Sequence, residues 1–220
     1  MYPKLGGNNT DIIMNPKLLL LSGGIDSTTL LADLTRQKGA VTALSFDYGQ
    51  KHQVELDFAQ RNASKYGVKA HYILPLAREP FEHSALVNKD CDLATYQNKP
   101  LPTGQVNAYV PFRNLVFLSY ALGLAQTLNI KDVYIAVNQD DSSNFWDCTS
   151  DFVQNLQNLV QLGSEINLCA PFLNRSKKEV IALANQLDVD LNQTISCYQP
   201  MGQEICKICL SCRLRAAALA

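Results

Sequence analysis

One short polar stretch near the N-terminus combines side chains and backbone suited to binding phosphate. It reads Ser22-Gly-Gly-Ile-Asp-Ser27, follows four consecutive leucines and leads into a helical pattern that opens with Asp26. Glycines let backbone N–H groups approach a ligand, and a helix N-terminus adds unpaired donors and a positive dipole end. The hydroxyls of Ser22, Ser27 and Thr28 are further donors. The stretch therefore predicts an anion-binding loop; the alternative is a strand-to-helix turn that happens to be glycine-rich.

The loop differs from two widespread phosphate-binding patterns. No Gly-Lys-Ser/Thr follows the glycines at the spacing of a Walker A motif, so no lysine of the loop itself reaches terminal phosphates. The dinucleotide fingerprint would need a third glycine. We therefore expect phosphate to be bound here by backbone N–H groups and hydroxyls.

Four cysteines near the C-terminus have the spacing of metal ligands, Cys-x8-Cys-x2-Cys-x2-Cys: Cys197, Cys206, Cys209 and Cys212. Four thiolates complete a tetrahedral zinc site and leave no position for a reacting water, so we expect a structural zinc that stabilises a segment with little core. An iron–sulfur cluster and unligated thiols are the alternatives. Of the remaining cysteines, Cys169 is expected to be buried, and Cys148 is a candidate reactive thiol.

Two cations stand at predicted helix starts, where the helix dipole opposes them. Arg113 precedes a long apolar helical pattern, and Lys177 lies in the first turn opened by the capping box Ser176-Lys-Lys-Glu179. A bound carboxylate or phosphate would offset this unfavourable position. Both cations are therefore predicted to meet an anionic ligand, although a surface role is the alternative for each.

Polar and aromatic residues follow two of the predicted strands. Asp47 and Tyr48 follow one, and Asn138, Asp141 and Trp146 follow the other. Ligands of doubly wound sheets bind beyond the carboxyl ends of the strands, and a planar heterocycle needs stacking faces and a few placed hydrogen bonds. We expect these residues to face nucleotide or substrate. The alternatives are a solvated turn at residues 47–50 and a loop in which Asp147 caps the next helix.

These residues need a scaffold of alternating strands and helices, which the hydrophobic pattern predicts. Strands are expected at residues 18–21, 41–46, 69–74, 133–137 and 166–170, and helices at residues 52–66, 115–128 and 148–162 and after residues 25 and 176. This alternation predicts an α/β fold with a doubly wound parallel sheet. Residues 75–109 interrupt the pattern with prolines and a glycine, and are interpreted as a lid, a binding loop or a dimer contact.

Composition limits the class of partner. The chain has 220 residues, enough for one α/β domain with a small appendage, and a formal net charge of −1. Such a near-neutral chain favours a small-molecule substrate over nucleic acid. No apolar run approaches the ~20 residues of a membrane span, and residues 1–15 lack the apolar stretch of a signal peptide. We expect a cytoplasmic protein with no membrane partner and with reduced cysteines.

Taken together, the motifs resemble those of the 7-cyano-7-deazaguanine synthase family within the ATP pyrophosphatase (PP-loop) superfamily. The matching stretches are Leu-Ser-Gly-Gly-Ile-Asp-Ser-Thr-Thr, Phe-Asp-Tyr-Gly-Gln-Lys-His with Glu55, Tyr-Val-Pro-Phe-Arg-Asn, residues 138–148, Ser176-Lys177-x-Glu179, and Ser-Cys-Tyr with the three-cysteine tail. The resemblance implies a sheet of the adenine nucleotide alpha hydrolase-like type. We predict a flexible leader at residues 1–16, since Met14 offers a second plausible start, an ATP-binding α/β domain at residues 17–190 and a zinc-binding segment at residues 191–220.

The resemblance also implies an activity. Family members convert 7-carboxy-7-deazaguanine, ammonia and ATP into the nitrile through adenylated intermediates, as a step toward queuosine, and are commonly homodimeric zinc proteins that use Mg²⁺ with ATP. Stabilising developing negative charge is what adenylation chiefly requires, and Asp26, Lys177 and Arg113 would serve it. By matching positions, ATP would contact Leu21, Ser22, Gly23, Gly24, Ile25, Asp26, Ser27, Thr28, Thr29, Leu30 and Leu31. The substrate would contact Asp47, Tyr48, Arg113, Asn114, Asn138, Asp141 and Trp146.

The chain departs from the family pattern in its substrate-facing segments. Phe112 stands where the family usually has glycine, and Asn144, Phe145 and Trp146 stand where it usually has Gly-Tyr-Pro. The bulk of Phe112 and Trp146 is expected to reshape the pocket. The alternatives are an enzyme that stops at the amide or joins the acid to another amine, a tRNA-modifying enzyme, and a non-catalytic nucleotide sensor.

Overall fold

The centre of the molecule is a parallel sheet. The computed structural model describes residues 15–202 and 204–220, so most of the predicted leader lies outside the described residues. The strands are β1 (Lys17–Leu20), β2 (Val41–Asp47), β3 (Ala70–Pro75), β4 (Asp132–Tyr134) and β5 (Asn167–Cys169). They lie in the order β3-β2-β1-β4-β5 and pair in parallel throughout. This confirms the predicted doubly wound α/β fold.

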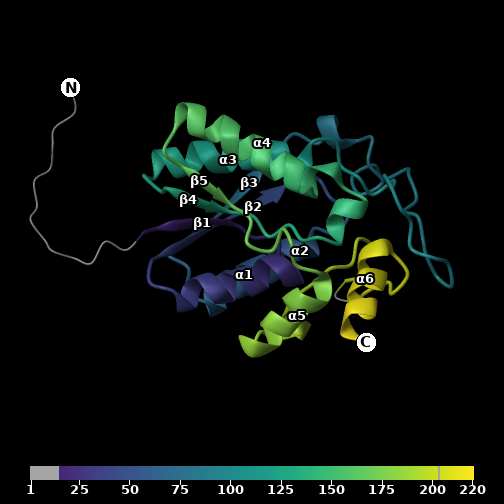
Figure 1. Ribbon diagram of the computed structural model, residues 1–220. Helices are drawn as coiled ribbons and strands as arrows, with labels where there is room; N and C mark the ends of the chain where they lie inside the picture. The colour runs from purple at the N-terminus through teal and green to yellow at the C-terminus, as the bar shows by residue number, and fades with distance from the viewer. Residues whose placement is uncertain (1–14, 203) are drawn as a thin grey trace, which may run out of the picture.

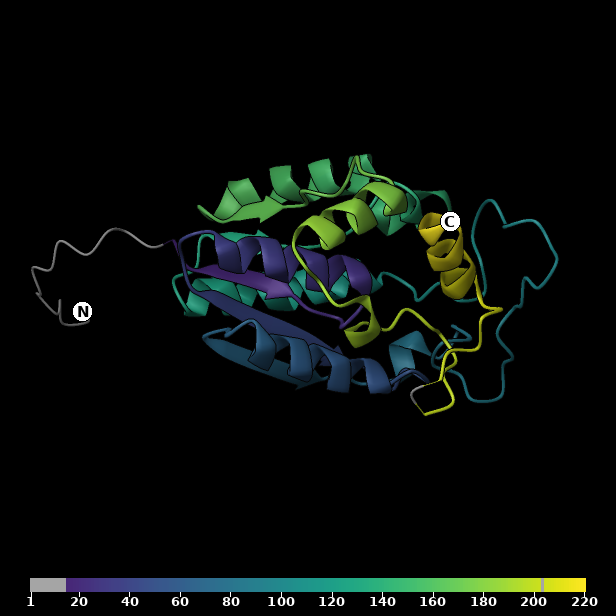
Figure 2. The ribbon, with the colours of Figure 1, turned by 90° about the horizontal axis from the view of Figure 1, so that it is seen from below.

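Helices cover both faces of the sheet. They are α1 (Ile25–Arg36), α2 (Val54–Lys65), α3 (Arg113–Thr127), α4 (Ser150–Gly163), α5 (Lys177–Gln186) and α6 (Leu210–Leu219). Helices α3 and α4 lie on one face, α1, α2 and α5 lie on the other, and α6 packs beside α5 (Figures 1 and 2). The winding therefore reverses between β1 and β4, and their carboxyl ends border a crevice of the kind in which α/β proteins bind ligands. None of the described helices has the length and apolarity that crossing a bilayer requires.

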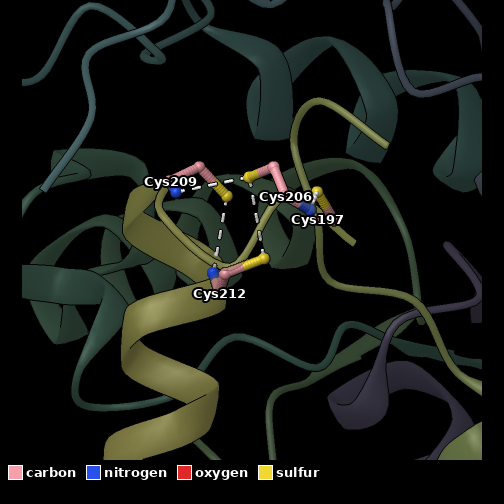
Figure 3. A group of neighbouring side chains, drawn as sticks. All are labelled: Cys197, Cys206, Cys209 and Cys212. Carbon is pink, nitrogen blue, oxygen red and sulfur yellow. Dashed lines mark hydrogen bonds between the residues drawn. The ribbon is translucent and has the colours of Figure 1, made fainter. Parts of the chain in front are cut away.

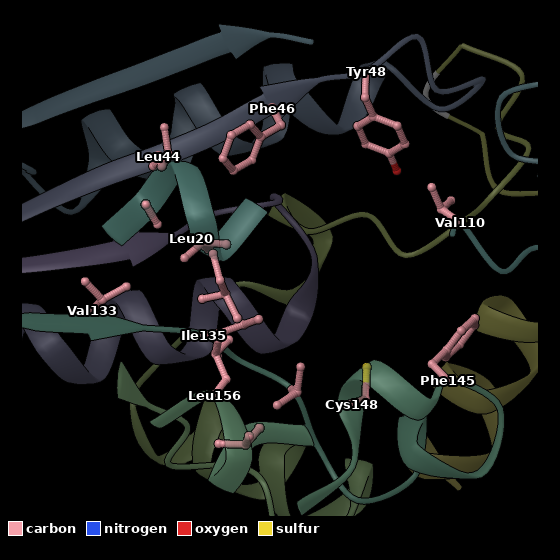
Figure 4. Close-up of a cluster of buried hydrophobic side chains, with 14 of the residues drawn as sticks. Leu20, Leu44, Phe46, Tyr48, Val110, Val133, Ile135, Phe145, Cys148 and Leu156 are labelled. Atoms are coloured by element: carbon pink, nitrogen blue, oxygen red, sulfur yellow. The ribbon is translucent and has the colours of Figure 1, made fainter. Parts of the chain in front are cut away.

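The four consecutive leucines at residues 18–21 lie in the middle of the molecule, between the two layers of helices. Leu18 and Leu20 belong to the cluster on the side of α3 and α4, which also contains Phe46 (Figure 4). Leu19 and Leu21 belong to the cluster on the side of α1. A strand covered on both faces needs an uninterrupted apolar run instead of an alternating one. This rigid, buried β1 holds the loop that follows it in place.

The chain between β3 and α3 forms little regular structure, as its prolines indicate. It contributes buried side chains to the core beside α3, including Leu86, Val87 and Val106. The Tyr96 N–H donates to the carbonyl of Ile208 at 2.8 Å, which ties the segment to the cysteine-rich tail. Its role as a lid, binding loop or dimer contact stays a prediction.

Two local interpretations are corrected by the structure. Helix α4 is capped by Thr149, whose hydroxyl accepts from the Phe152 N–H at 3.3 Å, and Asp147 does not cap it. The Asp147 carboxylate accepts instead from the Asn114 N–H in the first turn of α3, at 3.1 Å. Helix α3 also begins at Arg113 and not at residue 115. Asp147 thus serves a helix that is distant from it in sequence, and not the helix that follows it.

Candidate functional site

A cavity of about 220 Å³ opens at the carboxyl edge of the sheet, beside the β1/β4 switch point. Five helices contribute residues of their first turn to its lining, namely α1, α2, α3, α5 and α6. A helix N-terminus has N–H groups without partners inside the helix itself and the positive end of a dipole. The convergence of five such ends favours an anionic ligand.

The predicted anion-binding loop after β1, residues 22–27, forms one wall of this cavity and is called the phosphate loop below. The hydroxyls of Ser22 and Ser27 lie 3.1 Å apart, and Ser22 Oγ accepts from the Gly24 N–H at 3.3 Å. Gly23 has a φ of +79°, and a Cβ atom there would lie 2.4 Å from the carbonyl oxygen of Glu55. Only glycine therefore lets α2 approach the loop this closely.

Three aspartates, Asp26, Asp140 and Asp141, lie around Lys177, the lysine in the cavity lining. The Lys177 ammonium donates to a carboxylate oxygen of Asp26, and its backbone N–H donates to Asp140 at 2.7 Å. Burial by itself lowers the pKa of Lys177, but the charges of Asp26 and Asp141 outweigh it and raise the pKa. Burial raises the pKa of Asp141, Lys177 lowers it, and the net direction is upward. Among the described residues, the second oxygen of Asp26 is buried without a partner.

Two tyrosines and an arginine form the opposite side. Tyr48 directly follows β2, and its hydroxyl points toward the space beside Val110 (Figure 4). Burial raises the pKa of Tyr48 to about 12, against the lowering effect of the Arg113 charge. Burial likewise raises the pKa of Tyr198, which also lines the cavity. Both phenols are therefore neutral hydrogen-bonding groups at physiological pH.

Several predicted site residues meet in this cavity. Those lining it are Leu21, Ser22, Gly24, Ile25, Asp26, Ser27, Tyr48, Arg113, Asn114, Asp141 and Lys177. They come from five separate parts of the chain. The fold thus assembles the phosphate loop and both predicted cations around one space.

Other predicted residues lie outside the lining. Gly23 packs against α2, and Thr28, Thr29, Leu30 and Leu31 are buried inside the fold. Asp47 accepts from the Gly49 N–H and from the Gln53 side chain, as in the predicted turn alternative. Asn138 is fully buried and donates to Asp141 at 2.6 Å.

Phe112 and Trp146, the two bulky residues that depart from the family pattern, also lie outside the cavity lining. Trp146 is 44% exposed and donates to the Tyr109 hydroxyl at 2.6 Å. Its ring meets that of Phe112 edge to face, with centroids 5.3 Å apart. The two bulky side chains contact each other at the surface instead of filling the cavity.

The cavity also contains residues that the sequence patterns did not single out. His52 and Glu55 line it from the turn before α2 and its first turn, and Ser196, Tyr198 and Ser211 line it from the tail. His52 and Glu55 could have been found from the stretch Phe-Asp-Tyr-Gly-Gln-Lys-His with Glu55, which runs from the end of β2 into α2. The Cys148 thiol also lines the cavity, but burial and the neighbouring carboxylates raise its pKa well above the usual value. Its thiol is therefore protonated at physiological pH, which does not favour the predicted reactivity.

The four C-terminal cysteines form one cluster (Figure 3). Their sulfur atoms all lie within 4.8 Å of one another, and those of Cys206 and Cys212 are 4.0 Å apart. Tetrahedral Zn–S bonds of ~2.3 Å would place sulfurs roughly 3.8 Å apart. Backbone N–H groups donate to the sulfurs of Cys197, Cys206 and Cys209 at 3.2–3.5 Å. Such donors suit thiolates, and the cluster can hold a metal ion such as zinc.

This cluster is joined directly to the cavity. Cys197 lies between Ser196 and Tyr198, both of which line the cavity. Ile195, the residue before Ser196, donates its N–H to the carbonyl of Gly23 at 3.1 Å. A metal bound by the cysteines would therefore also position part of the cavity wall.

Comparison with proteins of known sequence and structure agrees with this geometry. A 7-cyano-7-deazaguanine synthase of Leptospira interrogans is 38% identical over 94% of this chain and 88% of its own length. One of Rickettsia bellii is 36% identical, with 93% of each chain covered. An NMN synthetase of Francisella tularensis matches in structure with a TM-score of 0.50 and 17% identity, covering 89% of this chain and 71% of its own. This last likeness concerns the PP-loop type of fold alone.

The family model described as Queuosine biosynthesis protein QueC matches residues 17–220, which include the phosphate loop, the cavity and the cysteine cluster. Family membership therefore covers every element that contributes to the site. The chain belongs to the QueC family.

Proposed function

We propose that this protein is an ATP-dependent carbon–nitrogen ligase that converts 7-carboxy-7-deazaguanine and ammonia into 7-cyano-7-deazaguanine. The observation that carries the proposal is the convergence of five helix N-termini on one cavity that also contains Lys177 and Arg113. Adenylation brings together a triphosphate and a carboxylate, both anionic, and such a cavity suits both. The names of the relatives support the product.

The loop side of the cavity would bind the nucleotide. Backbone N–H groups and the hydroxyls of Ser22 and Ser27 would hold the phosphates that leave as pyrophosphate. Lys177 would neutralise the charge that develops on them in the transition state. The unpartnered oxygen of Asp26, with Asp141 nearby, offers the hard oxygen ligands that Mg²⁺ prefers. When bound there, the ion would supply further charge neutralisation.

The tyrosine side would bind the acid. Phe117 and Tyr48 both line the cavity and pack edge to face, with ring centroids 5.4 Å apart, and aromatic walls suit contact with a flat heterocycle. Arg113 would hold the carboxylate oxygens that attack the α-phosphate of ATP. The C–O–P linkage formed there activates the carboxyl carbon, and AMP leaves when ammonia attacks it, which gives the amide. A second ATP would then adenylate the amide oxygen, and loss of AMP and the two amide protons would leave the nitrile.

The cysteine cluster would hold a structural zinc. All four ligands would come from the protein, so the metal would have no open position for a substrate. Its contribution would be to stabilise the tail and to position Tyr198.

One product analysis tests the proposed function. The purified protein is incubated with ATP, Mg²⁺, ammonium and 7-carboxy-7-deazaguanine, and the products are followed by mass spectrometry and a pyrophosphate assay. We expect nitrile, AMP and pyrophosphate. Pyrophosphate with amide but no nitrile would identify an enzyme that stops at the amide. ATP binding without pyrophosphate release would contradict the proposal and favour a nucleotide sensor.

A further inference from the structure

A histidine in the cavity wall has no place in the chemistry described so far. His52 lies in the turn before α2, lines the cavity, and has a side chain that is 7% exposed. Among the described residues, its Nδ1 atom is buried without a hydrogen-bond partner. Leaving a buried polar atom unpaired is costly, so this nitrogen calls for a partner that enters the cavity.

A carboxylate determines which nitrogen of His52 is basic. The Nε2 atom lies 3.3 Å from an oxygen of Glu55, whose side chain is 16% exposed. The charge of this carboxylate favours the neutral ring that carries its proton on Nε2, which leaves the lone pair on Nδ1. Glu55 thus orients the imidazole so that its proton-accepting atom is the unpartnered one.

A further residue holds the Glu55 carboxylate in turn. The amide of Gln50 donates to Glu55 at 2.9 Å and to the carbonyl of Phe46 at 3.1 Å, and it accepts from the Tyr48 N–H at 2.9 Å. Gln50 is itself buried. The pair of His52 and Glu55, called the dyad below, is therefore anchored to the end of β2 and does not need to reorganise when it accepts a proton.

The dyad lies beside the proposed acid-binding side of the cavity. The charges of Arg113 and Glu55 both act on Tyr48, in opposite directions. The ring centroid of Tyr198 is 6.0 Å from that of His52, so Tyr198 is a second ionisable group beside the imidazole. Arg113 and the dyad thus flank the same tyrosine.

We propose that His52, oriented by Glu55, is the catalytic base that takes a proton from ammonium and delivers ammonia to the activated acid. The inference rests on the proposed function, because it assigns the second substrate of that reaction. At neutral pH ammonia is mostly ammonium, which has no lone pair with which to attack. A carbon–nitrogen ligase that uses it must therefore accept a proton.

The step balances in protons and electrons. Ammonium transfers one proton to Nδ1 of His52, and the freed lone pair forms the C–N bond with the acyl carbon. The acyl C–O bond breaks, and its electron pair leaves with AMP. The nitrogen loses a second proton to water, and the amide, AMP and a protonated His52 remain. His52 then returns its proton to solvent.

The test separates the ammonia step from adenylation. The variant His52→Gln offers an amide N–H to Glu55 but has no basic nitrogen, and His83→Gln, at an exposed histidine, is the matched control. ATP–pyrophosphate exchange with the acid and without ammonium reports adenylation alone. We expect exchange within about threefold of wild type, with amide formation at pH 7 and limiting ammonium lowered about 100-fold, the scale of a lost general base.

Alkaline pH provides the second measurement. There ammonia is present as the free base, so the deficit of His52→Gln should shrink to less than about tenfold. The inference is overturned if His52→Gln forms amide as wild type does, if its deficit persists at alkaline pH, or if exchange falls in parallel. Absence of exchange in the wild-type protein would contradict the proposed function itself, which is a different outcome.

Discussion

The ammonium group of Lys177 donates a hydrogen bond to the carboxylate of Asp26, although the two residues are 151 positions apart. The contact joins the first turn of α5 to the first turn of α1, and the two side chains are only 12% and 19% exposed. It places a cation directly beside the phosphate loop, where the helix dipoles alone would not attract one.

The first prediction concerns this lysine. Lys177→Met should lower kcat for pyrophosphate release by about 100- to 1,000-fold, because it removes the charge that stabilises the departing phosphates. Lys178→Met, at the exposed neighbouring position, is the matched control and should stay within twofold. Steady-state kinetics with the acid and ATP decide between them. Equal losses in both variants would contradict a specific role for Lys177.

The second prediction concerns stability and pH. Burial is the main cause of the raised pKa of Asp141, so the folded protein binds this proton more tightly than the unfolded chain does. The contribution of Asp141 to stability is therefore favourable at low pH, and it is lost as pH rises from the ordinary aspartate pKa of about 3.8 through the raised pKa of the folded protein. Asp141→Asn should raise Tm at pH 7 but not at pH 3.5.

Asp90→Asn, at an exposed position, controls for the general effect of removing a carboxylate. Thermal unfolding followed by circular dichroism at both pH values measures the difference. Asp141→Asn should also lower kcat, because Asp141 lies in the cavity. A variant less stable than wild type at pH 7 would show that the carboxylate is held mainly by Lys177.

The third prediction concerns the cysteine cluster. Cys206→Ser should abolish binding of one zinc ion per chain, measured by native mass spectrometry. We expect Tm to fall by roughly 10 °C or more, since each kcal/mol is worth about 2–4 °C in a chain of this size. Cys91→Ser, outside the cluster, should retain the metal. Unchanged metal content in Cys206→Ser would exclude this ligand set.

The fourth prediction concerns the departure at Phe112. This residue is the N-cap of α3 and has φ 51° and ψ 24°, a left-handed conformation that disfavours side chains with a Cβ atom. Phe112→Gly should therefore be more stable than Phe112→Ala by about 1 kcal/mol, because both lose the Trp146 contact but only glycine loses the strain.

Urea denaturation measures this difference. At the exposed helical position Asn155 in α4, the same pair of substitutions should show the opposite order, with alanine the more stable by about 1 kcal/mol. Because Phe112 does not line the cavity, the KM values of Phe112→Gly for ATP and the acid should differ from those of wild type by less than about threefold. A larger change in KM would support the expectation that its bulk reshapes the pocket.

Local patterns in the sequence determined much of this protein. The leucine run predicted the buried β1, the Ser176–Glu179 capping box predicted the start of α5, and the cysteine spacing predicted the cluster. The first two are decided by residues within about one turn or one strand of each other, where periodicity and capping rules apply. The phosphate loop was predicted for the same reason. The third, the cysteine cluster, is decided by the ligand spacing between Cys197 and Cys212.

Only the tertiary structure decided which of these local features meet. The reversal of winding between β1 and β4 brings Asp26 and Lys177 together and leaves Trp146 outside the cavity lining. It also gives Asp147 to the cap of α3, which no spacing along the chain indicates. The unpartnered nitrogen of His52 is likewise a property of packing, because burial and hydrogen-bond partners come from segments distant in sequence.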